Sequence, residues 1–202
     1  FFSSYQNSEI EKYLSDFISL VLLKYKKKKY LSKNNSNYKR LTLIRKILPK
    51  STFLIPFRDP LQQSYSLLNQ HKKFIKLQHK DKFILKYMNY LGHYEFGQNH
   101  QPWFKPIKFN DTDNINYWLE QWYLFYIKII DEFKLLNNCH LICYEKLCAN
   151  ENYKNELIEK IKITNEKLFK FDLSKKNTIQ NFDKDLLYKC NELYSTMVNL
   201  WK

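Results

Sequence analysis

The chain has 202 residues, of which 44% are apolar, enough for one ordinary globular domain with its own core. Its formal net charge is +14, but its arginines are confined to positions 40, 45 and 58, and Ala occurs once, a skew typical of an AT-rich genome. Part of the charge is therefore ascribed to composition, and specific nucleic-acid binding is only a secondary hypothesis. The longest apolar run, residues 18–23, is too short to cross a membrane, so no membrane span is expected in this chain.

The first third of the chain predicts two helices and a short strand. Apolar residues at 10, 13, 14, 17, 18, 21 and 22 predict a helix over 10–28, with Lys26–Lys29 at its solvated end. Tyr30 to Ser32 are expected to form a short strand that ends at Lys33. Ser36 or Asn37 then caps a helix through Leu48, which Pro49 stops.

A buried strand over 52–57 is predicted to turn directly into a helix that runs to about residue 78. Asp59 is a good N-cap, and Pro60 suits the first helical position. The free N–H groups of a helix N-terminus attract anions, and the guanidinium of Arg58 adds donors with the geometry of phosphate. The turn therefore predicts a binding site for a phosphorylated ligand.

The remainder completes an α/β pattern. A looser region over 80–113 contains both glycines, and a long helix over 114–136, a strand over 140–144, and helices over 151–162 and 183–200 follow. Strands separated by helices favour a single α/β domain over 1–202, with a mainly parallel sheet between two layers of helices. Ligands bind beyond the carboxyl ends of such strands, where Lys33, Arg58 and Glu145 are placed.

Cysteine usage indicates structural thiols. The four cysteines, at 139, 143, 148 and 190, include no C-x-x-C pair and no metal pattern. They are expected to be buried and free, which favours a reducing compartment such as the cytoplasm and predicts no metal cofactor.

These residues, in this order, resemble the sulfotransferase family. The family's signature is a strand that ends in Arg-(Asp/Asn)-Pro, with a helical Ser eight residues after the Arg. The resemblance covers roughly residues 28 to 150 and is carried by Lys33-Asn34-Asn35-Ser36-Asn37, Arg40-Leu41, Leu48-Pro49, Arg58-Asp59-Pro60, Ser66, the block from Lys86 to Gly97, Trp118-x-x-x-Trp122 and Leu141 to Leu147.

The resemblance implies a P-loop-nucleotide-hydrolase-like sulfotransferase fold and a co-substrate, 3′-phosphoadenosine 5′-phosphosulfate. A sulfuryl group would move from it to a hydroxyl or amine acceptor that the sequence does not identify. By this resemblance Arg58 and Ser66 bind the 3′-phosphate, with Ser64 as the competing serine. Lys33 would neutralise the transferring sulfuryl group, although a surface lysine is an equal alternative, and Glu145 is expected to be architectural.

The candidates for the general base lie between the two glycines of the chain. Gly92 and Gly97 bracket His93 and Glu95, which suggests a backbone shape that needs glycine. Glu95 is the predicted base and His93 its neighbour, the alternative being a loop anchored by a buried hydrogen bond. His71 is expected to face solvent or to line the acceptor pocket. Phe96, Trp103 and Phe104 are expected either to wall that pocket or to pack in the core.

One part of the family pattern is not seen. The family's loop rich in Gly, Ser, Thr and Lys, which holds the 5′-phosphosulfate, has no counterpart in residues 1–30. The chain begins Phe1-Phe2, so a fragment of a longer protein is one expectation and true loss of the loop is the other. The rival hypotheses are a non-catalytic sulfotransferase-like nucleotide-binding module and a basic nucleic-acid-binding protein.

Overall fold

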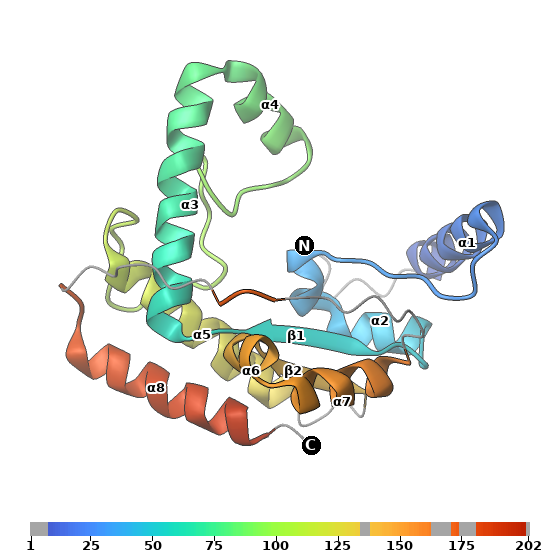
Figure 1. Cartoon of the computed structure of the whole chain (residues 1–202). Helices are drawn as coiled ribbons and strands as arrows, with labels where there is room; N and C mark the ends of the chain where they lie inside the picture. Colours follow the sequence, from blue (N-terminus) through green and yellow to red (C-terminus); the bar gives the residue numbers. More distant parts are fainter. Residues whose placement is uncertain (1–7, 134–137, 163–170, 174–180, 201–202) are drawn as a thin grey trace. The chain divides into compact units, whose positions relative to one another are not determined.

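A computed structural model describes residues 8–133, 138–162, 171–173 and 181–200 (Figure 1). These residues divide into two compact units. The smaller unit contains residues 8–53 and 138–139, and the larger unit contains the rest. The described chain is α/β and mostly helical, so the predicted class is confirmed at that level. A single domain over 1–202 stays a prediction.

The smaller unit is helical. Helix α1 (Ser8–Tyr25) is followed by a 3-10 helix, η1 (Asn35–Arg40), which continues into α2 (Leu41–Ile47). The first turn of η1 is capped by Asn34, whose side chain accepts a hydrogen bond from the amide of Ser36. The cap therefore lies two or three residues before the predicted one. An ion pair of 2.9 Å between Lys46 Nζ and Glu11 Oε1 joins α2 to α1.

The strand predicted at 30–32 is wrong. Residues 29–34 have no regular structure, and Tyr30 and Leu31 are exposed. A strand requires a neighbour to receive its backbone hydrogen bonds, and two apolar residues between Lys29 and Lys33 offer too little buried surface to hold one. Lys33 consequently does not lie at the end of a strand.

The larger unit is built around a parallel two-stranded sheet, β1 (Phe53–Phe57) beside β2 (Cys139–Cys143). Both strands were predicted to within one residue. Because they are parallel, their carboxyl ends lie at the same edge, followed by Arg58 in one case and Tyr144 in the other. Nothing in this sheet defines a three-layer arrangement.

Three long helices make the core of the larger unit. Helices α3 (Pro60–Lys80), α5 (Ile115–Phe133) and α8 (Lys184–Asn199) pack against one another (Figure 1). The core at the α3–α5 contact contains Leu68, Ile115, Tyr117 and Trp118. All three helices were predicted, although residues 134–136 of the helix expected over 114–136 lie outside the described residues.

Three shorter helices complete the larger unit. Helix α6 (Tyr144–Ala149) follows β2 directly, and α7 (Glu151–Ile161) matches the prediction. Helix α4 (Lys82–Tyr90) lies in the region that was expected to be loose. The carboxylate of Asp81 caps it by accepting the amide of Phe83 at 2.8 Å, a start signal that the sequence contains.

Residues 91–114, the long loop, are fixed to α5 by two buried side chains. The carboxylate of Glu120 accepts the amides of Ile107, Lys108 and Phe109 at 3.0, 2.9 and 3.4 Å. The carboxamide of Gln121 bonds both the amide and the carbonyl of Phe104, at 3.1 and 2.8 Å. These bonds satisfy backbone groups that no strand or helix pairs.

Candidate functional site

The candidate site begins at the turn between β1 and α3. The side chain of Asp59 caps α3 by accepting the amide of Gln62 at 2.8 Å, and Pro60 occupies the first helical position. Both features were predicted from the sequence and are confirmed. The turn places the positive end of the α3 dipole beside Arg58, at the carboxyl edge of the sheet.

Glu145, in the first turn of α6 directly after β2, holds this turn. Its Oε1 accepts the amide of Asp59 at 3.0 Å, and its Oε2 accepts the hydroxyl of Tyr194 at 3.0 Å. The predicted architectural role of Glu145 is therefore confirmed. Tyr194 lies on α8, so one carboxylate connects the ends of both strands with the last helix of the chain.

Arg58 lies against the same carboxylate. Its Nε is 4.0 Å from Glu145 Oε1, at the outer limit of an ion pair, and its guanidinium carbon is 4.9 Å from the ring centroid of Tyr144. The side chain is mostly buried. A cation stacked on an aromatic ring and restrained by a carboxylate has few accessible rotamers, so Arg58 is pre-organised at the strand end.

The two candidate serines on α3 have different surroundings. The hydroxyl of Ser64 is buried and donates to the carbonyl of Pro60 at 2.7 Å, within the helix. Ser66 is half-buried. Ser64 is therefore committed to an intrahelical bond, which leaves Ser66 as the better candidate ligand.

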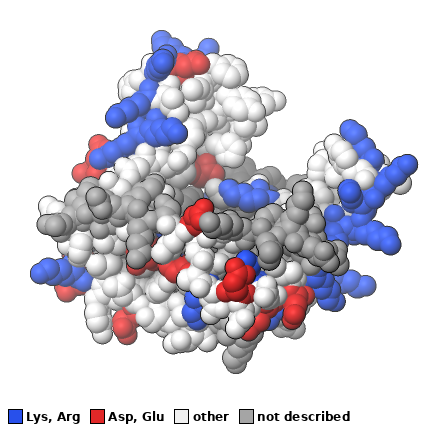
Figure 2. Space-filling view, viewed as in Figure 1, with Lys and Arg blue, Asp and Glu red and all other residues white. Residues whose placement is uncertain are grey.

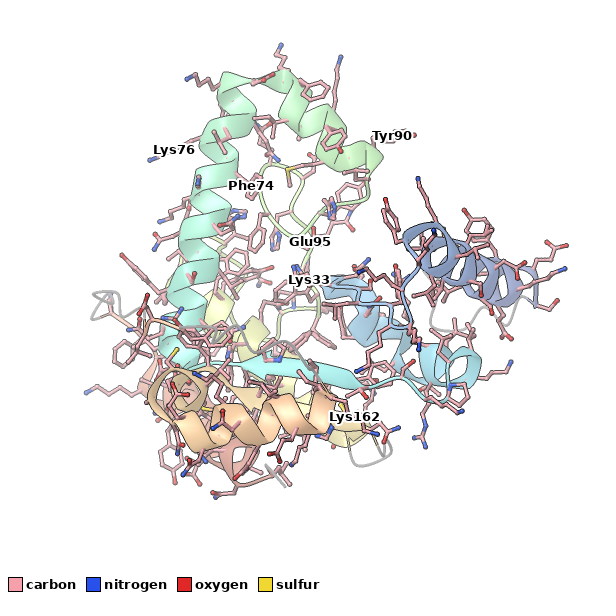
Figure 3. All side chains as sticks on the ribbon, turned by 45° about the vertical axis from the view of Figure 1, so that its right-hand side comes forward. Lys33, Phe74, Lys76, Tyr90, Glu95 and Lys162 are labelled. Carbon is pink, nitrogen blue, oxygen red and sulfur yellow. The ribbon has the colours of Figure 1, made fainter. Side chains whose placement is uncertain are left out.

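His93 and Glu95 lie together in the long loop. Nδ1 of His93 is 3.4 Å from the carboxylate of Glu95, and the Glu95 side chain is only 16% exposed whereas that of His93 is 55% exposed. A histidine beside a mostly buried carboxylate is an arrangement able to hold and transfer a proton. Figure 3 labels Glu95 within this loop.

The long loop is attached to α3 well away from Arg58. The amide of Gly97 donates to Nδ1 of His71 at 3.2 Å, and the amide of Gln98 donates to Oε1 of Gln78 at 2.7 Å. His71 is eleven residues beyond Pro60, which corresponds to about 16 Å along a helix. Arg58 lies just before the first turn of α3, whereas the loop that carries Glu95 is attached about three turns further along, so a ligand that contacts both residues has to extend along the helix.

Both glycines adopt the backbone that was predicted to require them. Gly92 has φ of +69° and Gly97 has φ of +92°. At Gly97, a Cβ would also collide with the carboxamide of Gln78. The interpretation of these glycines as conformational requirements is confirmed.

The buried His71 and the half-buried His100 form a cluster with aromatic rings. The ring of His71 lies 5.1 Å from that of His100 and 5.3 Å from that of Trp118, and Nε2 of His100 is 2.6 Å from the hydroxyl of Tyr117. Burial lowers the pKa of both histidines from the ordinary value of 6.5. His71 is thus a core residue, and the expectation that it faces solvent is wrong.

Two of the three candidate acceptor-wall aromatics, Phe96 and Trp103, pack against other aromatic rings. Phe96 stacks on Phe74 and on Trp118, with centroids 6.2 and 5.7 Å apart. Trp103 lies 5.8 Å from the ring of Phe125. Phe104 is tied to Gln121 through its backbone. Packing against other aromatic rings therefore accounts for Phe96 and Trp103.

Lys33 is exposed and lies in the smaller unit, whereas Arg58, Ser66, His93 and Glu95 lie in the larger one. Its predicted role in the sulfuryl site was inferred from a strand that does not exist. Lys33 therefore stays a candidate only through the family resemblance.

Neither the role of Tyr194 nor the position of the Tyr144 ring was predicted from the sequence. Tyr194 contacts the sheet edge from α8, with its hydroxyl 3.3 Å from Cys143 Sγ, and burial raises its pKa. Burial also raises the pKa of Cys143. The four cysteines are free, as predicted, and Cys139, Cys143 and Cys190 are buried, whereas Cys148 is only half-buried.

Within the described ranges, no three His, Cys, Asp or Glu side chains gather as metal ligands would. None of the helices in the described part of the chain is long and apolar enough to cross a bilayer. Comparison with family models, curated proteins and solved structures finds no match to this chain.

Proposed function

We propose that this chain is a sulfotransferase that uses 3′-phosphoadenosine 5′-phosphosulfate and transfers its sulfuryl group to a hydroxyl or amine acceptor. The observation that carries the proposal is the turn of Arg58 and Asp59 between the end of β1 at Phe57 and the start of α3 at Pro60, held by a hydrogen bond from the Asp59 amide to Glu145. The corresponding architecture would be the three-layer, P-loop-nucleotide-hydrolase-like fold of that family.

In this proposal Arg58 and Ser66 bind the 3′-phosphate of the donor. The positive end of α3 and the guanidinium both favour a phosphate dianion, and bonds between charged partners are the stronger class of hydrogen bond. The stacking of Arg58 on Tyr144 supports this role, because it fixes the direction of the donors before the ligand arrives.

The chemical step forms a bond between the acceptor oxygen or nitrogen and sulfur, and breaks the bond from sulfur to the phosphate oxygen of the donor. Adenosine 3′,5′-bisphosphate leaves with that electron pair. Glu95 accepts the acceptor's proton with His93 beside it. Catalysis then depends on positioning and charge rather than on a covalent enzyme intermediate.

Calorimetric titration with adenosine 3′,5′-bisphosphate tests the donor site. Arg58→Ala should weaken binding about 10- to 100-fold, as expected for loss of a charge-assisted contact. Arg58→Lys should recover only part of the affinity, because an ammonium lacks the planar fork. Arg45→Ala, on α2, is the matched control and should bind as the natural protein does. Thermal unfolding of each variant separates a folding defect from a binding defect.

Two results would contradict the donor site. If the natural protein does not bind the bisphosphate, the site is wrongly assigned. The same holds if folded Arg58→Ala binds with unchanged affinity.

Glu95→Gln tests the general base with a transfer assay. Removal of a general base should lower the transfer rate at least about 100-fold while the bisphosphate affinity is unchanged. Glu159→Gln, at an exposed position of α7, is the control and should keep full activity. Full activity of Glu95→Gln would remove Glu95 as the base. Bisphosphate binding without transfer in the natural protein would instead favour the non-catalytic nucleotide-binding module.

A further inference from the structure

We propose that the outer face of α4 is a docking surface for membranes that contain anionic phospholipids. This inference is independent of the donor site. It starts from three aromatic side chains that α4 leaves exposed, namely Phe83 (67%), Tyr87 (51%) and Tyr90 (86%). They are four and three residues apart, so they form one stripe along the helix.

The inner face of α4 is occupied, so the stripe is not a misplaced core. Met88 is buried and accepts a hydrogen bond from the side chain of Gln78 at 3.2 Å. The carbonyl and the side chain of Asn89 bond with Tyr94 and Asn99 of the long loop. Helix α4 therefore presents its aromatic face from a fixed base.

Lysines flank the aromatic stripe. Lys82 and Lys86 precede Phe83 and Tyr87 by one residue each, and Lys80 ends α3 nearby; all three are exposed. The ion pairs found among the described residues involve none of these lysines. The nearest acid in sequence, Asp81, is used to cap α4. The face is therefore cationic as well as apolar.

Figures 2 and 3 show where charged and uncharged side chains lie at this end of the larger unit. In Figure 2 blue side chains gather around the α3–α4 end of the larger unit, beside a broad uncharged surface. In Figure 3 Tyr90 projects outward from the end of α4, in the direction opposite to Lys76 of α3.

The chemistry of this face favours a lipid surface. Aromatic rings insert at the boundary between headgroups and acyl chains, while lysines extend their ammonium groups to the phosphates. The aliphatic side chain of Leu91, 46% exposed, extends the stripe and would add nothing to base stacking. The rings of Phe83 and Tyr87 also stack on each other at 5.7 Å, which occupies a face of each that a nucleic-acid base would need.

Vesicle co-sedimentation of the full chain tests the proposal, using phosphatidylcholine vesicles with and without phosphatidylserine. The natural protein should bind the mixed vesicles at least about tenfold more tightly than the neutral ones, and less tightly as salt increases. The double change Lys82→Gln with Lys86→Gln should weaken binding about 30-fold, at roughly fivefold per lysine. The triple change Phe83→Ser, Tyr87→Ser and Tyr90→Ser should abolish it.

Matched changes on α1 and in the residues directly after it serve as the control. Leu20 and Leu23 are also exposed apolar residues, and Lys27 and Lys28 are also exposed lysines. Changing them to Ser and Gln should leave vesicle binding within about twofold. Circular dichroism melting checks that every variant folds.

Several outcomes would overturn the proposal. One is that the natural protein fails to sediment with the mixed vesicles. Another is that the α4 variants bind these vesicles as tightly as the natural protein does. A third is that only the control variants at Leu20, Leu23, Lys27 and Lys28 lose vesicle binding. The α4 changes reduce binding to single-stranded oligouridine and not to vesicles, which would assign the face to nucleic acid. Light scattering shows a dimer that the triple change dissociates, which would assign the face to a second copy of the chain.

Discussion

The amide of Gly97 points at Nδ1 of His71 while its α-carbon faces the side chain of Gln78. A single residue without a side chain thus allows the long loop to approach α3 closely and to bond with two of its buried polar groups. The backbone angle alone does not explain the need for glycine here, since Gly92 has a positive φ in open space.

This difference predicts unequal effects of two identical substitutions. Gly92→Ala should lower the free energy of unfolding by about 1 kcal/mol, the cost of a left-handed backbone for alanine. Gly97→Ala should lower it by about 3 kcal/mol, because a collision with Gln78 is added to that cost. Urea denaturation of both variants measures the difference. Equal losses would mean that Gln78 moves aside freely.

At other positions, too, a single polar side chain bonds with two distant groups at once, as the half-buried Glu145 and the buried Gln121 show. Glu145 accepts an amide from one turn and a hydroxyl from α8, and Gln121 satisfies both the donor and the acceptor of Phe104. In each case a long-range contact replaces a local one. Such side chains are costly to bury alone and stabilising when fully paired.

Among the elements, the contact of the long loop with α3 and α5 depends on neutral histidines. His71 accepts the Gly97 amide through Nδ1, so it must be neutral and carry its proton on Nε2. His100 lies between His71 and Tyr117, with the backbone carbonyls of Tyr94 and Glu95 near its ring. Asp113 and Lys72 act on His71 in opposite directions, but burial is the larger cause of its lowered pKa.

Acidification should therefore destabilise this contact. In the unfolded chain, His71 and His100 have the ordinary pKa of about 6.5, whereas in the folded chain their pKa values are lower. As the pH decreases below 6.5, the unfolded chain therefore binds more protons than the folded chain. The free energy of unfolding consequently falls between pH 6.5 and the lowered pKa values. The urea midpoint should fall between pH 7 and about pH 5. The carboxylate of Asp183, whose pKa is also lowered by its bond with Lys108, contributes only at more acidic pH.

His71→Asn separates this effect from a general one. Asparagine keeps an acceptor for the Gly97 amide but does not titrate, so the variant should show a smaller dependence of stability on pH. His79→Asn, at an exposed position on the same helix, should keep the full dependence. An unchanged profile in His71→Asn would show that His71 is not a source of the effect.

At the scale of the whole molecule, the elements with local signals could be predicted and those with distant partners could not. Asp59 and Pro60 predict the start of α3, and the apolar run over 52–57 predicts β1. Helix α4 was missed although Asp81 marks its start, because the exposed aromatics on its outer face blur the apolar pattern of its inner face. The false strand at 30–32 shows the opposite error, in which a short apolar pair has no neighbour.

In the candidate site, too, features with a local sequence signal could be predicted and contacts between distant segments could not. Arg58, Ser66 and Glu145 follow from position in a strand–helix turn, and the two glycines correctly marked a special backbone around His93 and Glu95. The stacking of Arg58 on Tyr144 and the contact of Tyr194 with Glu145 depend on how β2 and α8 pack, which adjacent sequence does not encode. The buried position of His71 likewise depends on a loop that lies 26 residues further along the chain.

The three amides that converge on Glu120 have a consequence for how this sequence is able to diverge. The carboxylate of Glu120 accepts the amides of residues 107, 108 and 109, and the adjacent Gln121 accepts the amide of residue 104. The number of residues between these bonds is therefore constrained. Side chains there are free to vary because the bonds involve backbone atoms. An inserted or deleted residue would carry the amides off the carboxylate and leave a buried charge unsatisfied. Relatives of this chain should therefore differ in this segment by substitution and keep its number of residues.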